Sequence, residues 1–191
     1  MADSKLIVIE GAQGAGKTTI TDYIRYSLSC TNLYRLSGTR DSSPTGLEKS
    51  ISMYEILLDY IKKLENTSVN LLFDRTFFTE EVYCRLGKKQ YSFTEEYNKL
   101  LERFSKLDFD IYYVTLYLDD ESKYAERLER SGKAVYESSK FGVENSITQQ
   151  KEYLKMSKEI EKKYPKIKVI NINTNRDFEI VKNEIREKIG F

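Results

Sequence analysis

The amino-acid sequence predicts an α/β protein built on a doubly wound sheet of five parallel strands. Short runs of strand-forming residues alternate with longer segments of helical periodicity along the 191 residues. Three of the five strand-like runs are almost continuously apolar, as expected where helices cover both faces of a sheet. No repeat, low-complexity tract or linker-like stretch divides the chain, so we expect a single domain over residues 1–191.

The predicted strands and helices alternate in the order that crossover connections require. Strands are expected at 5–10, 32–36, 69–73, 111–118 and 166–172. Helices are expected at 17–29, 47–65, 76–86, 95–107, 121–130, 147–163 and 178–189. Pro44 and Pro165 both fall between these elements, where proline is tolerated. Three helix starts carry the pattern of a capping box: Thr45 with Glu48, Ser92 with Glu95, and Ser146 with Gln149.

The composition excludes several classes of protein. Hydrophobic residues make up 40% of the chain and charged residues 32%, which is typical of a folded globular protein and not of a disordered one. The 31 Lys and Arg residues balance the 30 Asp and Glu residues, so we expect no nucleic-acid partner. The chain has no histidine, which excludes a Ser-His-Asp site.

The sequence also indicates where the protein resides. No apolar run approaches the ~20 residues of a membrane span, and the first residues contain too short an apolar run for a signal peptide. Cys30 and Cys84 lie far apart in the sequence and form no metal-binding pair. Because a reducing compartment suits such thiols, we expect a cytoplasmic protein without a membrane partner.

The most specific motif lies between the first predicted strand and the first predicted helix. Residues 11–18 read G-x-x-x-x-G-K-T, the pattern of a phosphate-binding P-loop. Glycines allow a sharp turn that points successive N–H groups at a phosphate, and the N-terminus of the next helix favours negative charge. Lys17 is then expected to contact the β- and γ-phosphates of ATP, and the Thr18 hydroxyl to hold Mg²⁺. The expected ATP-binding residues are Gly11, Gln13, Gly14, Ala15, Gly16, Lys17, Thr18 and Thr19.

The rest of the sequence excludes two other classes of P-loop protein. Neither D-x-x-G nor N-K-x-D, the tetrads expected of a switch GTPase, occurs anywhere in the chain. The chain is also short for a large mechanical ATPase. A kinase acting on a small molecule is the class that remains.

Three further matches, together with the first strand and its P-loop, make the sequence resemble the thymidylate kinase family, which is related to the deoxynucleoside kinases. The segment T-R-D-S-S-P-T at 39–45 resembles the family's T-R-E-P-G-G-T loop. The D-R pair at 74–75 ends the third predicted strand, and V-T-L-Y-L-D at 114–119 resembles the family's fourth strand. The resemblance extends over essentially the whole chain.

Five residues are predicted to act on the acceptor side. Asp74, at the carboxyl end of a buried strand, is placed to orient Mg²⁺, and Arg75 to bind the acceptor or transferred phosphate; a simple strand-end ion pair is the alternative. The resemblance implies that Arg40 binds the phosphate of a monophosphate substrate, whereas Asp41 falls where deoxynucleoside kinases carry their catalytic glutamate. Both residues could instead belong to a solvated turn. Tyr83 lies where the family places an aromatic residue, with a core role as the alternative.

The resemblance also implies a mobile lid at about 127–146 that closes over ATP. Because no basic residue precedes Lys17 within the P-loop, the lid is the expected source of a transition-state arginine, and Arg127 is the first choice. Arg130 and Lys133 accompany it. A solvated helix face with ion pairs between neighbouring turns is the alternative.

The acceptor pocket departs from the family pattern. Gln13 stands where the family usually has an acid that contacts the sugar hydroxyl, and no arginine lies between Arg40 and Arg75 to read the base. The leading hypothesis is an ATP- and Mg²⁺-dependent kinase that phosphorylates a deoxynucleoside monophosphate, with dTMP first. One alternative is a deoxynucleoside kinase in which Asp41 is the base, and another is a nucleotide-binding protein without turnover. The resemblance further implies a homodimer and a small-molecule nucleotide substrate.

Overall fold

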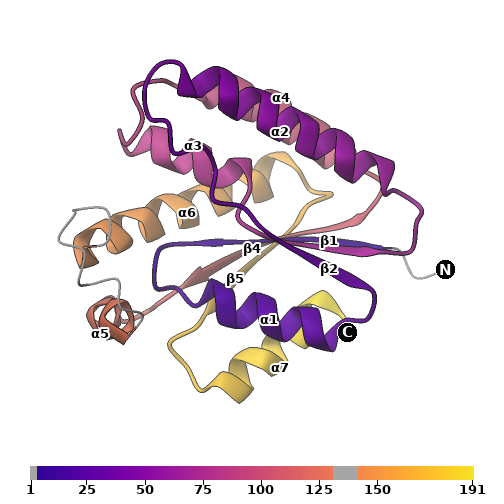
Figure 1. Ribbon diagram of the computed structural model, residues 1–191. Helices are drawn as coiled ribbons and strands as arrows, with labels where there is room; N and C mark the ends of the chain where they lie inside the picture. Colours follow the sequence, from indigo (N-terminus) through magenta and orange to yellow (C-terminus); the bar gives the residue numbers. More distant parts are fainter. Residues whose placement is uncertain (1–3, 131–141) are drawn as a thin grey trace.

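A computed structural model describes residues 4–130 and 142–191, and a five-stranded parallel sheet lies at its centre (Figure 1). The strands are β1 (Lys5–Gly11), β2 (Thr31–Arg35), β3 (Asn70–Asp74), β4 (Asp110–Tyr117) and β5 (Lys168–Asn173). Their order in the sheet is β2-β3-β1-β4-β5, and all neighbours are parallel. The predicted α/β fold with a doubly wound parallel sheet is confirmed.

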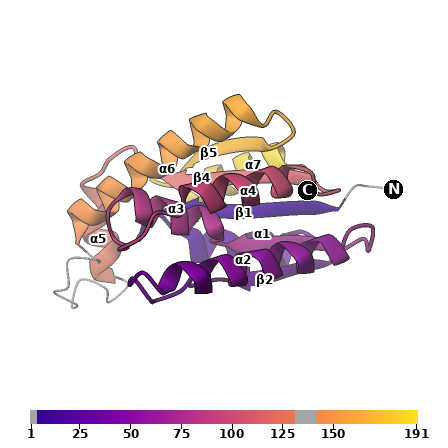
Figure 2. The same ribbon diagram turned by 90° about the horizontal axis from the view of Figure 1, so that it is seen from above.

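The helices form one layer on each face of the sheet. They are α1 (Lys17–Ser27), α2 (Gly46–Lys63), α3 (Phe77–Arg85), α4 (Thr94–Ser105), α5 (Lys123–Arg130), α6 (Val143–Lys163) and α7 (Phe178–Ile189). Helices α1 and α7 cover one face, and α2, α3, α4 and α6 cover the other (Figures 1 and 2). Helix α5 lies beyond the end of β4 (Figure 1).

Successive residues of β1 face opposite layers of helices. Leu6 and Val8 pack into the core shared with α2, α3, α4 and α6, while Ile7 and Ile9 pack into the core shared with α1 and α7. All four side chains are fully buried. The continuous apolar run in the sequence therefore reflects a strand that is covered on both faces.

The strand order determines where a ligand can bind. After β1 the chain passes through α1 to β2 and β3 on one side of β1, and then crosses to β4 and β5 on the other. In open parallel sheets, ligands bind beyond the carboxyl ends of the strands at the point where the order reverses. The loop between β1 and α1, which carries the G-x-x-x-x-G-K-T motif, lies at this point.

None of the three predicted capping boxes forms: α4 follows Phe93 and not Ser92, and the starts of α2 and α6 differ as follows. Helix α6 begins at Val143 after Gly142, four residues before the predicted start, so Ser146 is buried inside the helix and does not cap it. Thr45 does precede α2, but its hydroxyl donates to Asp41 Oδ2 at 3.1 Å and not to the helix backbone. Residues 131–141 of the predicted lid, with Lys133, lie outside the described residues. Among the helices of the described ranges, none combines the length and apolar character that crossing a bilayer requires.

Candidate active site

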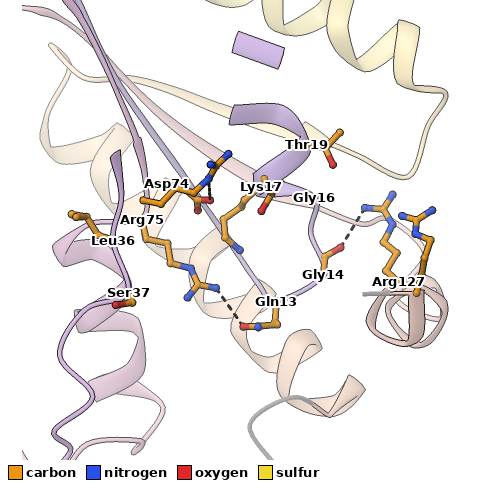
Figure 3. A pocket seen from close by; sticks show the side chains of 13 residues that line it. Gln13, Gly14, Gly16, Lys17, Thr19, Leu36, Ser37, Asp74, Arg75 and Arg127 are labelled. Atoms are coloured by element: carbon orange, nitrogen blue, oxygen red, sulfur yellow. Dashed lines mark hydrogen bonds and ion pairs between the residues drawn. The ribbon is translucent and has the colours of Figure 1, made fainter. Parts of the chain in front are cut away.

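A cavity of about 370 Å³ opens at the carboxyl edge of the sheet. Its wall is formed by the loop between β1 and α1, the first turn of α1, the ends of β2 and β3, and the last turns of α5 (Figure 3). The lining residues are Gln13, Gly14, Gly16, Lys17, Thr18, Thr19, Arg35, Leu36, Ser37, Asp74, Arg75, Arg127 and Arg130. The fold thus brings most of the predicted ATP-binding residues together with residues from three other parts of the chain.

The glycines of the loop occupy conformations that other residues rarely adopt. Gly14 and Gly16 have φ angles of 85° and 93°, in the left-handed region, and Gly16 is the N-cap of α1. A Cβ on Gly11 would lie 2.7 Å from the carbonyl oxygen of Leu116 on the neighbouring strand. The loop therefore turns sharply into α1 beside β4, and the helix N-terminus faces the cavity. This is the backbone arrangement that suits a phosphate.

Lys17 is the first residue of α1, and its side chain reaches back across the loop. Its side chain is largely buried, and Nζ donates to the carbonyl oxygens of Gly11 and Ala12 at 2.8 Å each. Thr18 and Thr19 follow on the same helix turn and are exposed to the cavity. Gly11 and Ala15 are buried and do not line the cavity, so their predicted contacts with ATP stay a prediction.

Asp74 and Arg75 enter the cavity from the end of β3. Asp74 is nearly buried, and its Oδ2 lies 3.9 Å from Nε of Arg35. Arg75 points toward the loop, where its guanidinium donates to Gln13 Oε1 at 3.4 Å (Figure 3). Asp74 thus takes part in a strand-end ion pair with Arg35, as in the alternative considered above, whereas Arg75 reaches Gln13.

The side chains present fit Mg²⁺ as part of a nucleotide complex. Thr18 and Asp74 line the same cavity and offer a hydroxyl and a carboxylate, the oxygen ligands that Mg²⁺ takes. Within residues 4–130 and 142–191 no group of three or more His, Cys, Asp or Glu side chains could hold a metal ion. Binding of Mg²⁺ through Thr18 and Asp74, with phosphate and water oxygens completing the ligand set, stays a prediction.

Arg127 joins the predicted lid to the P-loop. Its guanidinium donates to the carbonyl oxygen of Gly14 at 3.4 Å (Figure 3) and to the hydroxyl of Thr174 at 3.2 Å. A third hydrogen bond reaches the carbonyl oxygen of Thr174. Burial, and the nearby charge of Arg130, lower the pKa of Arg127. The alternative of a purely solvated helix face does not describe this residue, because Arg127 is half-buried against the loop that it was predicted to serve.

Arg40 and Asp41, both predicted on the acceptor side, lie outside the cavity. Arg40 is exposed and is not part of the lining. Asp41 accepts hydrogen bonds from Lys49 and from the backbone and hydroxyl of Ser43. These hydrogen bonds, with that from Lys49 the strongest, hold the pKa of Asp41 well below its ordinary value. In this structure Asp41 organises the turn that leads into α2, as in the solvated-turn alternative. A role for Arg40 or Asp41 in substrate binding stays a prediction.

Tyr83 lies half-buried on α3 and does not line the cavity. Its ring is 6.0 Å from Nζ of Lys88, and the tyrosine raises the pKa of Arg75, opposing the effect of burial. Tyr83 is therefore a neighbour of Arg75, and its predicted contact with a substrate remains untested.

Two charged residues at the site were missed by the sequence analysis. Arg35, the last residue of β2, lines the cavity, pairs with Asp22 of α1 and stands opposite Asp74 in the sheet register. Glu10, near the end of β1, is fully buried. The sequence contains a feature that could have indicated each residue. Arg35 lies near the end of a predicted strand, and Glu10 is a carboxylate that ends an apolar run. Neither signal indicates by itself which neighbours the residue meets.

The fold and the loop together define a P-loop protein with the architecture of nucleoside and nucleotide kinases. Among solved structures, a thymidylate kinase from Candida albicans matches with a TM-score of 0.70 at 18% identity, over 98% of this chain and 91% of that one. A deoxyadenosine kinase from M. mycoides with bound dATP matches with a TM-score of 0.65 at 18% identity, over 97% and 99%. A thymidylate kinase from Ehrlichia chaffeensis matches with a TM-score of 0.61 at 17% identity, over 98% and 99%. No family model matches the chain, and no curated protein matches its sequence.

Proposed function

We propose that the protein is an ATP- and Mg²⁺-dependent kinase that phosphorylates a deoxynucleoside monophosphate, with dTMP as the first candidate. The observation that carries this proposal is the charge of the cavity. Lys17 and four arginines, Arg35, Arg75, Arg127 and Arg130, line it together with one carboxylate, Asp74. A reaction between ATP and a phosphorylated acceptor brings two anionic groups together, and several cations on separate elements suit that pair.

Lys17, Arg75 and Arg127 have distinct roles in the proposed reaction. Bound Mg²⁺ would neutralise charge on the phosphates as the γ-phosphoryl group is transferred. The N–H groups of the loop and Lys17 bind the ATP phosphates, and Arg75 orients the acceptor phosphate from the end of β3. Arg127 approaches the loop from the opposite side and stabilises the charge that develops during transfer. The solved kinases of the same fold support this reaction class.

A deoxynucleoside kinase is the second candidate. One of the solved structures with this fold is a deoxyadenosine kinase. A nucleoside hydroxyl must lose its proton during transfer and therefore needs a base within reach. Asp41, the base suggested by the resemblance, is engaged by Lys49 and Ser43 and does not line the cavity, which favours the monophosphate.

The experiment is a coupled assay of ADP release with dTMP, dAMP, dCMP, thymidine and deoxyadenosine, on the wild type and on Asp41→Asn. We expect turnover with a monophosphate and little with the nucleosides. Robust turnover of a nucleoside, abolished in Asp41→Asn, would establish the second candidate instead. Absence of turnover with every acceptor, despite measurable ATP binding, would support a nucleotide-binding protein without catalysis.

A further inference from the structure

Arg75 has a backbone conformation that arginine rarely adopts. Its φ angle is 71°, in the left-handed region, where a side chain with a Cβ is strained. Such a conformation persists only where the surrounding structure holds it. The turn follows β3 directly, and the same conformation directs the Arg75 side chain into the cavity (Figure 3). Whatever holds this turn therefore also determines where the guanidinium lies.

Two consecutive residues of β1 hold the turn. The backbone N–H of Arg75 donates to the carbonyl oxygen of Ile9 at 3.1 Å. The backbone N–H of Thr76 donates to Oε1 of Glu10 at 2.8 Å. The first bond is ordinary main-chain pairing between neighbouring strands. The second depends on one side chain, and that side chain lies 66 residues away in the sequence.

Glu10 also supplies hydrogen-bond acceptors at the start of α3, to the N–H of its N-cap and to a hydroxyl of its first turn. Thr76 is the N-cap of this helix, but its own side chain makes no capping hydrogen bond. The other carboxylate oxygen of Glu10 accepts from the hydroxyl of Thr79 at 2.6 Å, in the first turn of the helix. The hydroxyl of Tyr153, on α6, lies 2.7 Å from that of Thr79. The carboxylate thus meets the start of α3, where an acceptor is needed.

The surroundings of Glu10 indicate that the length of its side chain is more important for the contact with the turn than its charge. The side chain is fully buried, with Lys17 and Arg75 on the cavity side and the tyrosines Tyr54, Tyr113 and Tyr153 among the helices and β4. Burial raises the pKa of Glu10 to about 7, against the hydrogen bonds from Thr79 and Thr76. A proton on Oε2 leaves Oε1 free to accept from Thr76. The contact with the turn therefore survives in both protonation states.

We propose that Glu10 is a positioning residue: its Oε1 holds the Asp74–Thr76 turn in the conformation that directs Arg75 toward the phosphate of the acceptor. Glu10 does not line the cavity, so it acts through Arg75. The identity of the acceptor rests on the proposed function, whereas the coupling between Glu10 and Arg75 does not. No atom of Glu10 touches the reacting groups in this proposal.

The test distinguishes the effect of side-chain length from the effect of charge with two substitutions at position 10. Glu10→Asp keeps the carboxylate but withdraws it by one methylene, and Glu10→Gln keeps the reach to Thr76 but removes the charge. Glu81→Asp is the matched control, because Glu81 is equally buried on α3 but binds Arg85 and Thr94 instead of the turn. Arg75→Ala defines the full loss, and Glu10→Asp combined with Arg75→Ala completes a double-mutant cycle.

Two measurements are made on each variant. The first is the KM for the acceptor monophosphate, with kcat and the KM for ATP. The second is the affinity for inorganic phosphate, measured by calorimetry on protein saturated with ADP, which requires no turnover. We expect Glu10→Asp to raise the acceptor KM and weaken phosphate binding by about ten- to a hundredfold, as displacement of a positioned group does. Glu10→Gln should retain most of the affinity, and the control should change only stability.

The outcomes are decisive for the proposal in either direction. In the Arg75→Ala background, Glu10→Asp should add little, because its effect passes through Arg75. Equal losses in Glu10→Gln and Glu10→Asp, or fully additive losses in the double variant, would overturn the positioning role. If Glu10→Asp does not fold, Glu10→Gln decides alone: a loss of phosphate affinity as large as that of Arg75→Ala would contradict the proposal. A wild type that binds phosphate through Arg75 without turnover would refute the kinase reaction and leave the coupling intact.

Discussion

At the scale of single residues, the most specific prediction concerns the role of Lys17 in phosphate binding. Its Nζ donates to the carbonyl oxygens of Gly11 and Ala12, at 2.8 Å each. Because these bonds lie within the loop and not between elements of the core, we expect Lys17→Ala to fold. Loss of one preorganised charge should lower kcat by about 10²–10³. Steady-state kinetics at saturating ATP, with circular dichroism as the folding control, measure this; near-native kinetics in a folded variant would contradict the assignment.

A second prediction compares two arginines on the acceptor side. Arg35 lines the cavity with its Nε 3.9 Å from Asp74 Oδ2, whereas Arg40 is exposed outside it. Arg35→Ala should lower kcat/KM for the acceptor roughly tenfold or more, because a hydrogen bond to a charged group is worth about 1.5–3 kcal/mol. Arg40→Ala should have the smaller effect. The opposite ranking in acceptor kinetics would restore the assignment of the phosphate to Arg40 that the family resemblance suggested.

At the scale of elements, the side chain of Arg127 links α5 to the P-loop by hydrogen bonds. Arg127 extends from α5 to Gly14, and to Thr174 in the segment after β5. If Arg127 acts on the transition state alone, Arg127→Ala should lower kcat by about 10²–10³ with little change in the KM for ATP.

Arg127→Lys serves as the control for charge without the planar guanidinium, and it should restore only part of the rate. The assay is steady-state kinetics with ATP as the varied substrate. Unchanged kcat in Arg127→Ala would limit this residue to holding the loop and the end of α5 together.

The helix starts show how far helix N-caps can be predicted from local sequence patterns. A Ser or Thr followed by Glu or Gln signals a cap, but several such pairs compete and only tertiary contacts select among them. Phe93, and not Ser92, precedes α4, and Gly142 precedes α6. At α3 the acceptor comes from Glu10 on another element. Local sequence patterns carry no information about an acceptor that lies 66 residues away.

At the scale of the whole molecule, the burial of Glu10 couples folding to pH. Its pKa is raised from 4.5 to about 7, so ionisation opposes folding. The stabilisation that comes from the raised pKa of Glu10 is fully present below pH 4.5 and is lost as the pH rises through about 7. Over this range the free energy of unfolding should fall by on the order of 3 kcal/mol. Glu10→Gln removes this titration, and the free energy of unfolding of the variant should therefore fall less between these pH values than that of the wild type.

Urea unfolding at several pH values between 4.5 and 8 measures the difference between the two proteins. Other carboxylates with lowered pKa values, such as Asp110 and Glu184, contribute equally to both and cancel in the comparison. Parallel curves for wild type and variant would show that Glu10 titrates at its ordinary value. The homodimer implied by the resemblance also belongs to this scale and stays a prediction, which light scattering in solution can test.

The sequence by itself determined the architecture and the phosphate-binding loop of this protein. Alternating strand-like apolar runs and helical runs are local sequence signals that every parallel sheet covered on both faces must carry. The phosphate-binding loop is one continuous segment, so its glycines and its lysine appear together in the sequence. Tertiary structure decided which further charged residues accompany Asp74 and Arg75 at the cavity. The register of β2 against β3 sets Arg35 opposite Asp74, while Arg40, five residues further along, lies outside the cavity. Likewise, helices α3 and α6 close over Glu10 and turn a charged residue of an apolar strand into a buried partner of the Arg75 turn. These relations depend on which elements pack together, and no short segment of sequence contains them.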